Sequence, residues 1–174
     1  MSVKFSIERA CDEALNRIAE GDHEALTVIY DKLGRKIFML AYSILGERTL
    51  AEDVMQQTFV KLITSSSGYK KGTNAVSYIL KTTQNLSFNA LKKKNRQNEC
   101  LCPVDETIPF KEEKELSALE SLQILSEEDR MIVVLKLDTK STHKEISALL
   151  GISVASCEKR YRRALQKLKE YYRS

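Results

Sequence analysis

The side chains of this chain that could do chemistry are mostly cations, and they gather in two places. One group lies near the middle of the sequence and consists of Lys92, Lys93, Lys94 and Arg96. The other lies near the C-terminus and consists of Lys159, Arg160, Arg162, Arg163, Lys167, Lys169 and Arg173. The 174 residues carry a formal net charge of only +4, so the two groups stand out locally. Two basic surfaces favour two contacts with a polyanion, and solvated helix faces are the alternative.

The C-terminal cations coincide with a helix-turn-helix pattern. Thr142 and Glu145 have the spacing of a capping box that would open a helix from Thr142 to Leu150. Gly151 supplies the positive φ that the turn needs, and a long basic helix follows from Val154 to Tyr171. In this motif the second helix enters the major groove of DNA. We therefore predict that DNA is contacted by Ser156, Glu158, Lys159, Arg160, Arg162 and Arg163.

Two crossing helices need small or apolar residues where they meet. Ser147 is the small residue expected on the first helix, and Cys157, Tyr161 and Leu165 are the residues expected to face it from the second. An ordinary helical hairpin with a basic surface is the alternative interpretation of this segment.

Enzymatic and metal chemistry find little support in the sequence. It contains no G-x-x-x-x-G-K phosphate loop and no Ser-His-Asp pattern. Cys100 and Cys102 lack the usual zinc-ligand spacing, and neither of the two histidines lies near a cysteine in sequence. We expect reduced thiols, no metal, no cofactor and no enzymatic activity.

The sequence also lacks the apolar segments that target or anchor proteins. No stretch reaches the roughly 18 apolar residues that span a bilayer. The first ten residues carry charges and have no apolar signal core. We expect a cytoplasmic protein without membrane insertion.

The elements that must position these residues are helices. Apolar residues recur at spacings of three and four from Leu26 to Leu45, and Gly46 would end that helix. A Thr49–Glu52 capping box would open the next, which buries one face and leaves Glu52, Asp53, Gln56 and Gln57 outside. Further helices are predicted around Cys11 to Ala19, after Asn74 as N-cap, and after Ser126 as cap.

These patterns predict an all-α protein of two small helical domains joined by a flexible linker. Strand signals are absent. Residues 1–95 form the first predicted domain and residues 112–174 the second. The linker, residues 96–111, lacks periodicity and holds both prolines of the chain, Pro103 and Pro109.

Four blocks of residues, spread over almost the whole length of the chain, occur in a recognisable order. The block GD-x-x-A-x-x-x-[LI]-Y stands here as Gly21, Asp22, Ala25, Ile29 and Tyr30. The block A-E-D-V-x-Q-x-x-F stands as Ala51, Glu52, Asp53, Val54, Gln56 and Phe59. A W-L-x-x-I-A-x-N helix is represented by Tyr78, Ile79, Thr82, Thr83 and Asn85. The E-I-A-x-x-L-G-I-S turn with R-x-x-R-A is represented by Glu145, Ile146, Ser147, Leu150, Gly151, Ile152, Ser153, Arg160, Arg163 and Ala164. With these blocks in this order, the chain resembles extracytoplasmic-function (ECF) sigma factors over almost its whole length.

The resemblance implies a function and a role for each block. In the family, region 2 binds core RNA polymerase and the melted minus-ten element, and region 4 reads the minus-thirty-five element. By carry-over, Asp53, Gln56 and Gln57 would bind the β′ clamp helices of the polymerase. The minus-ten element would be held by Tyr69, Lys70, Lys71, Lys81 and Asn85. Glu158 stands where the family often has a cation, so the promoter sequence that is read would differ.

The resemblance also implies partners and leaves an alternative. The partners are core polymerase, including its β subunit, promoter DNA, and an anti-sigma protein of the kind that commonly holds such factors inactive. We expect a monomer when the chain is free. The alternative is a stand-alone helix-turn-helix regulator, which would bind duplex operators by itself as a dimer.

Overall fold

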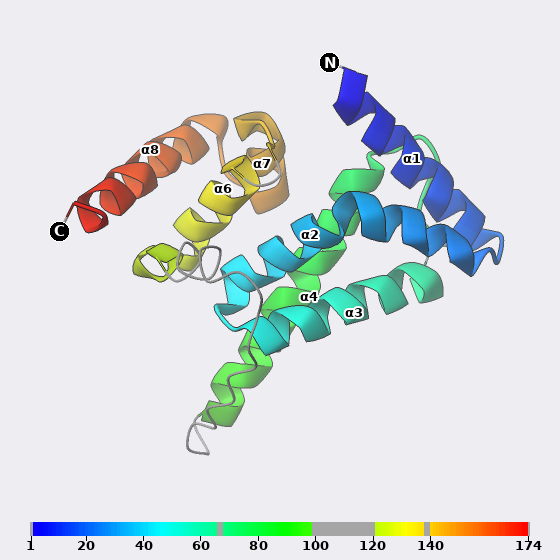
Figure 1. The fold of residues 1–174 in the computed structure, drawn as a ribbon, viewed down its shortest axis with the longest axis horizontal. Coiled ribbons are helices and arrows are strands. Elements are labelled where there is room, and N and C mark those ends of the chain that lie inside the picture. The colour runs from blue at the N-terminus through cyan, green and yellow to red at the C-terminus, as the bar shows by residue number, and fades with distance from the viewer. Residues whose placement is uncertain (1, 66–67, 99–120, 138–139, 174) are drawn as a thin grey trace. The chain divides into compact units, whose positions relative to one another are not determined.

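A computed structural model describes residues 2–65, 68–98, 121–137 and 140–173 of the chain (Figure 1). These residues form helices and connecting turns, and no strand occurs among them. The all-α prediction is confirmed. The chain divides into two compact units, Met1–Phe88 and Asn89–Ser174. The predicted domain limits stay predictions, and residues 99–120, which include most of the predicted linker and both cysteines of the Cys100–Cys102 pair, lie outside the described residues.

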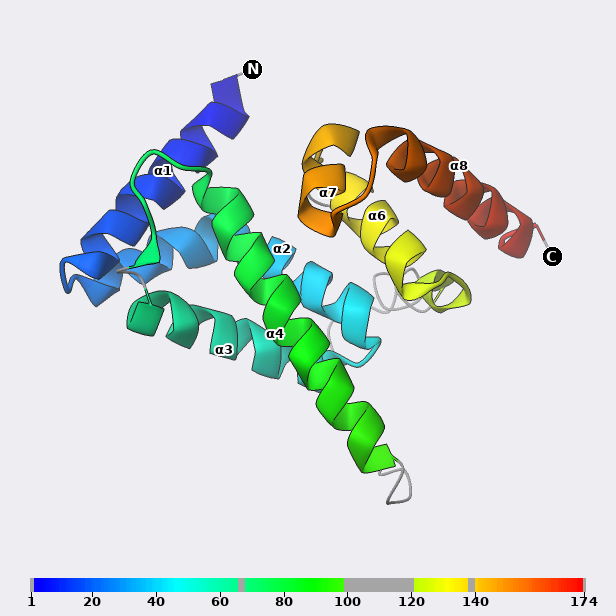
Figure 2. The same ribbon diagram turned by 180° about the vertical axis from the view of Figure 1, so that it is seen from behind.

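The helices of the first unit surround one apolar core. They are α1 (Ser2–Ala19), the short 3₁₀ helix η1 (His23–Ala25), α2 (Leu26–Leu45), α3 (Arg48–Ser65) and α4 (Ala75–Asn98), whose last part belongs to the second unit. Helix α2 packs against both α1 and α3. Helix α4 crosses α2 and α3 on the side that is nearest the viewer in Figure 2. All four α-helices contribute to the core, which includes Leu15, Ile29, Leu33, Leu62 and Ile79.

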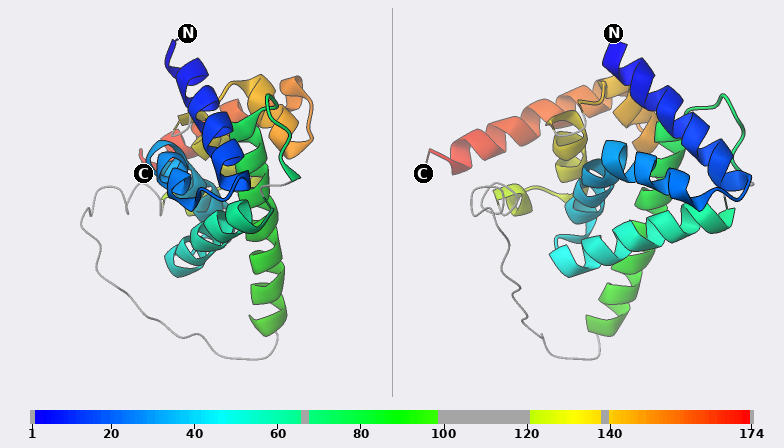
Figure 3. Two further views of the ribbon diagram at one scale, coloured as in Figure 1. Left: turned by 90° about the vertical axis from the view of Figure 1, so that its right-hand side faces the viewer. Right: turned by 45° about the vertical axis from the view of Figure 1, so that its right-hand side comes forward.

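The loop between α3 and α4 runs beside α1, as two further views show (Figure 3). Helix α4 begins directly after Asn74, whose Oδ1 accepts a 2.7 Å hydrogen bond from the backbone N–H of Ser77. The predicted N-cap is therefore confirmed. Gly46 ends α2 with φ of 65°, a left-handed conformation that glycine adopts without steric cost, as predicted.

The start of α3 differs from the prediction. The helix begins at Arg48, so Thr49 lies inside its first turn and the predicted Thr49–Glu52 capping box is wrong. Glu52 instead accepts a 2.7 Å hydrogen bond from Nε of Arg48, four residues earlier on the same helix. A favourable i, i+4 ion pair has taken the place of the reciprocal cap.

The described helices of the second unit, besides the end of α4, are η3 (Leu122–Ile124), α6 (Glu127–Leu137), α7 (His143–Leu150) and α8 (Val154–Tyr171). Helix α8 packs against both α6 and α7. Its buried face is formed by Cys157 and Ala164, with Tyr161 and Leu168 partly buried beside them. Leu165 is 37% exposed, so its predicted inward position is wrong. The inward residues follow spacings of four, three and four, which puts Ala164 in the place expected for Leu165.

The first helix of the predicted helix-turn-helix is capped as the sequence indicated. Thr142 and Glu145 form the reciprocal capping box of α7, and Gly151 ends that helix with φ of 69°. Ser147 is buried, as expected for the small residue at the crossing. The predicted Ser126 cap of α6 is also confirmed, because its Oγ accepts a hydrogen bond from the backbone N–H of Asp129.

Candidate functional site

One face of α3 presents three polar residues at a groove. Val54, Thr58 and Leu62 recur at spacing four and are buried, which turns Asp53, Gln56 and Gln57 outward. These three exposed residues line a groove of about 400 Å³, together with Val60, Lys61, Thr64 and Leu86. The structure thus brings together all three residues predicted to bind polymerase.

Val60 is an apolar residue of this groove that the sequence analysis did not assign to it. Its side chain is 59% exposed, although most apolar residues of α3 are at least half-buried. Val60 lies among the polar lining residues Asp53, Gln57 and Lys61 of the groove. The departure of Val60 from the inward stripe of α3 was readable in the helical pattern.

The predicted minus-ten residues occupy the loop before α4 and one face of that helix. Lys70 and Lys71 are exposed, and a turn closes where the Lys70 carbonyl accepts from the Thr73 backbone N–H at 3.1 Å. Lys81 and Asn85 are exposed at spacing four on α4, so they share a face of the helix. The Lys81 ammonium donates to Oε1 of Gln84 at 2.8 Å.

Tyr69 connects the loop to that face. Its ring packs against the ring of Tyr78 with centroids 5.2 Å apart, and Tyr78 lies three residues before Lys81 on α4. The Tyr69 hydroxyl donates to Oδ1 of Asp12 on α1 at 2.6 Å. Tyr69 is therefore a half-buried, anchored side chain, and its contact with the minus-ten element stays a prediction.

The environment of this contact shifts both partners' pKa values. The hydrogen bond from the Tyr69 hydroxyl is the larger cause that lowers the pKa of Asp12 below its ordinary value, and the hydrogen bond from the Gly72 backbone N–H is the smaller one. Burial is the larger cause that raises the pKa of Tyr69 to about 12, and the hydrogen bond to Asp12 is the smaller one. Both shifts favour an ionised carboxylate facing a protonated phenol at neutral pH.

Helix α8 presents the predicted DNA-reading residues. Ser153 caps the helix by accepting a 3.1 Å hydrogen bond from the Ser156 backbone N–H. Glu158, Lys159 and Arg162 are exposed. Oε1 of Glu158 lies 3.6 Å from Nδ1 of His143 at the start of α7, so a residue of the first helix touches a candidate base-reading residue of the second.

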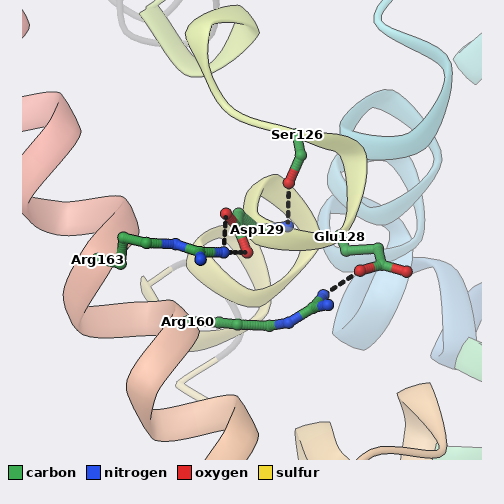
Figure 4. Close-up of polar contacts among 5 residues, drawn as sticks. All are labelled: Ser126, Glu128, Asp129, Arg160 and Arg163. Carbon is green, nitrogen blue, oxygen red and sulfur yellow. Dashed lines mark hydrogen bonds and ion pairs between the residues drawn. The ribbon is translucent and has the colours of Figure 1, made fainter.

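Two predicted DNA-contacting arginines point toward α6 (Figure 4). Nη2 of Arg163 lies 3.1 Å from Oδ2 of Asp129, whose side chain is only 3% exposed. Arg160 pairs with Glu128, and this hydrogen bond raises the pKa of the guanidinium. Arg160 and Arg163 therefore hold α8 to α6, and their contact with DNA stays a prediction.

The described residues offer little for other chemistry. No group of three or more His, Cys, Asp or Glu side chains that could hold a metal occurs among them. Cys11 and Cys157 are buried free thiols, and burial raises the pKa of both, that of Cys11 to about 11. Of the helices described, none combines the length and apolar character needed to cross a membrane.

Comparisons with known proteins match both units. A family model described as "Sigma-70 region 2" matches residues 29–97, and one described as "Sigma-70, region 4" matches residues 115–168. Among curated relatives, RNA polymerase sigma factor CarQ of Myxococcus xanthus is 25% identical over 163 residues, covering 90% of this chain and 94% of the relative. ECF RNA polymerase sigma factor SigE of Mycolicibacterium smegmatis is 28% identical over 168 residues, covering 88% of this chain and 65% of that one.

The fold is also found in solved structures. CnrH, in complex with the cytosolic domain of CnrY, has a TM-score of 0.71 and 21% identity, with 94% of this chain and 97% of the other covered. The sigma factor RpoE in complex with the anti-sigma factor NepR, from Bartonella quintana, has a TM-score of 0.68 and 18% identity, with 80% and 91% covered.

Proposed function

This chain belongs to the ECF group of the sigma-70 family of RNA polymerase sigma factors and directs promoter-specific transcription, and we propose that it does so through three surfaces. The first surface lies on α3, the second on the α3–α4 loop together with α4, and the third on α8. The observation that carries the proposal is the presence of both sigma-70 regions, in order, on one chain. A stand-alone regulator would have no need of region 2.

The groove on α3 is the proposed polymerase-binding surface. Asp53, Gln56 and Gln57 provide hydrogen-bonding groups around the exposed Val60. An apolar centre within a polar rim excludes water from the contact while the rim fixes its orientation. The proposed partners are the clamp helices of the β′ subunit, with further contacts to the β subunit.

The loop and α4 are the proposed surface for the minus-ten element. Lys70, Lys71 and Lys81 supply charge for the backbone of a melted strand, and Asn85 supplies hydrogen bonds to a base. Tyr69, packed on Tyr78, supplies an aromatic surface against which a base could stack.

Helix α8 is the proposed surface for the minus-thirty-five element. Lys159 and Arg162 are placed to donate to guanine or to phosphates, Glu158 to accept from cytosine, and Ser156 to bind either. Arg160 and Arg163 contribute by fixing the helix through Glu128 and Asp129.

The proposal includes a location and a regulator. The protein acts in the cytoplasm, where polymerase and promoters are found, and RNA synthesis is carried out by the polymerase itself. An anti-sigma protein is the proposed inhibitor, because the structural neighbour RpoE was solved with the anti-sigma factor NepR. The neighbour CnrH was solved with the cytosolic domain of CnrY.

Run-off transcription with purified core polymerase on genomic DNA of the source organism tests the function. Start-site-specific transcripts that depend on the chain are expected. In a separate binding measurement with purified core polymerase, Asp53→Ala combined with Gln56→Ala is expected to weaken the affinity of the chain for the core by about tenfold or more. Asp31→Ala, at an exposed position of α2 outside the groove, is the control. Absence of any specific transcript would refute the function, and unchanged core binding would refute the groove assignment.

A further inference from the structure

One carboxylate of α1 holds the loop proposed to bind the minus-ten element. Oδ1 of Asp12 accepts a 2.6 Å hydrogen bond from the Tyr69 hydroxyl and a 2.9 Å hydrogen bond from the Gly72 backbone N–H. The Thr73 carbonyl also lies 2.8 Å from the Tyr69 hydroxyl. One hydroxyl hydrogen serves one strong acceptor, and the ionised carboxylate is the stronger of the two.

A second carboxylate on the same face of α1 reaches the start of α4. Glu8 lies one turn before Asp12, and its Oε1 accepts from the Val76 backbone N–H at 3.4 Å. Asp12 therefore secures the middle of the loop, and Glu8 makes a longer contact near its end. Both contacts join elements that are far apart in sequence.

The consequence for Tyr69 is a fixed ring position. Its hydroxyl is tied to Asp12 and its ring is packed on Tyr78, so both ends of the side chain are constrained. Gly72, the other residue bound by Asp12, has φ of 78° and forms the turn that presents Lys71. A loop ordered before binding spares the DNA contact the entropy cost of ordering it.

We propose that Asp12 is a positioning residue for minus-ten recognition, which fixes Tyr69 and the Gly72 turn for capture of the melted strand without touching DNA itself. The proposal rests on the function proposed above for this loop. It makes a prediction opposite in sign to simple electrostatics. Removing a negative charge near a DNA path should tighten DNA binding, whereas removing a positioning contact should weaken it.

The test measures affinity of the holoenzyme for a labelled single-stranded oligonucleotide that carries the non-template minus-ten sequence found by run-off transcription. Asp12→Asn is expected to weaken this affinity by about tenfold. Glu13→Gln, which removes a charge at the exposed neighbouring position of α1, is expected to leave it unchanged or slightly tighter. Core-polymerase binding, measured in parallel, is expected to be the same for both variants.

Tyr69→Phe tests the same hydrogen bond by changing its donor. It keeps the ring and removes only the hydroxyl, so it should fold and weaken oligonucleotide binding by a similar factor. The double variant Asp12→Asn/Tyr69→Phe is expected to lose less affinity than the two single variants added together, because both changes act on one hydrogen bond, which Asp12→Asn weakens and Tyr69→Phe removes.

The outcomes separate this proposal from the one on which it rests. A wild-type holoenzyme that does not bind the oligonucleotide refutes the minus-ten assignment of the loop, and the role of Asp12 with it. Wild-type binding with equal or tighter binding by Asp12→Asn overturns the role of Asp12 alone. If Asp12→Asn loses both core binding and oligonucleotide binding, Asp12 serves general folding and the proposal is overturned. If the losses of the two single variants add in the double variant, Asp12 does not act through Tyr69, and the proposal is overturned as well.

Discussion

The hydrogen bond between Asp12 and Tyr69 links the stability of the first unit to pH at both ends of the scale. In the folded protein the pKa of Asp12 lies below its ordinary value of 3.8. The contribution of Asp12 to the free energy of unfolding is therefore fully present above pH 3.8 and is lost as the pH falls through the folded pKa. Tyr69 has a folded pKa raised from 10.0 to about 12, so its contribution is present below 10.0 and is lost as pH rises through about 12. Near neutral pH both contributions are complete.

We predict that Asp12→Asn lowers the free energy of unfolding by about 1 kcal/mol near neutral pH, since a charge-assisted hydrogen bond becomes a neutral one. Urea denaturation of both proteins from neutral pH down through the acid range measures the difference. It should decrease as pH falls below 3.8, because wild-type Asp12 becomes protonated. A difference that stays constant over this range would contradict the ionised contact.

The neighbouring arginines Arg162 and Arg163 should behave differently on substitution. Arg162 is exposed, whereas Arg163 pairs with the buried carboxylate of Asp129. Arg163→Ala is predicted to lower the free energy of unfolding by about 2 kcal/mol, because it leaves Asp129 without its partner. Arg162→Ala should change stability by less than about 0.5 kcal/mol and weaken promoter binding.

The double variant Arg163→Ala/Asp129→Asn supplies the control, since it removes the unpaired charge as well. Thermal or urea unfolding should show it to be more stable than Arg163→Ala alone. If Arg163→Ala is as stable as wild type, the ion pair is not what holds α8 to α6.

At the scale of elements, the turn between α7 and α8 depends on the backbone of Gly151. Its φ is 69°, and an added Cβ would meet no atom within 4 Å, so the cost of a side chain lies in the backbone alone. Gly151→Ala is predicted to lower the free energy of unfolding by about 1 kcal/mol. Gly151→Asn should lose less, because asparagine tolerates this conformation better. Equal losses in urea denaturation would contradict a purely conformational cause.

Elements whose ends depend on local residues were predictable from sequence. Gly46, Asn74 and the Thr142–Glu145 box act within one or two turns of their own helix, so their spacing alone carries the information. Thr49 shows the limit of such reasoning. Its spacing to Glu52 fits a cap, but Arg48 competes for the same carboxylate four residues away. Local spacing does not decide between two local partners.

The candidate site was predictable where a residue acts through exposure on a helix. The inward stripe of α3 correctly left Asp53, Gln56 and Gln57 outside, at what proved to be one groove. The anchors of Tyr69 and Arg163 were not predictable, because Asp12 and Asp129 lie far from them in sequence. Contacts of that kind depend on the packing of helices, which periodicity does not specify.

At the scale of the whole molecule, the proposed function assigns DNA contacts to both units. Each phosphate neutralised by a lysine or arginine releases counterions and steepens the dependence of affinity on salt. Lys70 and Lys71 in the first unit and Lys159 and Arg162 in the second are the exposed cations proposed to contribute. Binding two promoter elements by one chain also raises the effective concentration of the second contact.

We predict that the salt dependence of promoter binding by the holoenzyme divides between the two units. Replacing Lys70 and Lys71 by alanine, or Lys159 and Arg162 by alanine, should each reduce the slope of log K against log salt by about 1 to 2. The four changes together should reduce the slope by the sum of the two reductions, because the two pairs lie in separate units. Lys32→Ala, an exposed cation of α2 outside the proposed DNA surfaces, should leave the slope unchanged. A slope that responds to the α8 pair alone would leave promoter contact to region 4 and remove the loop from the proposed DNA-binding surface.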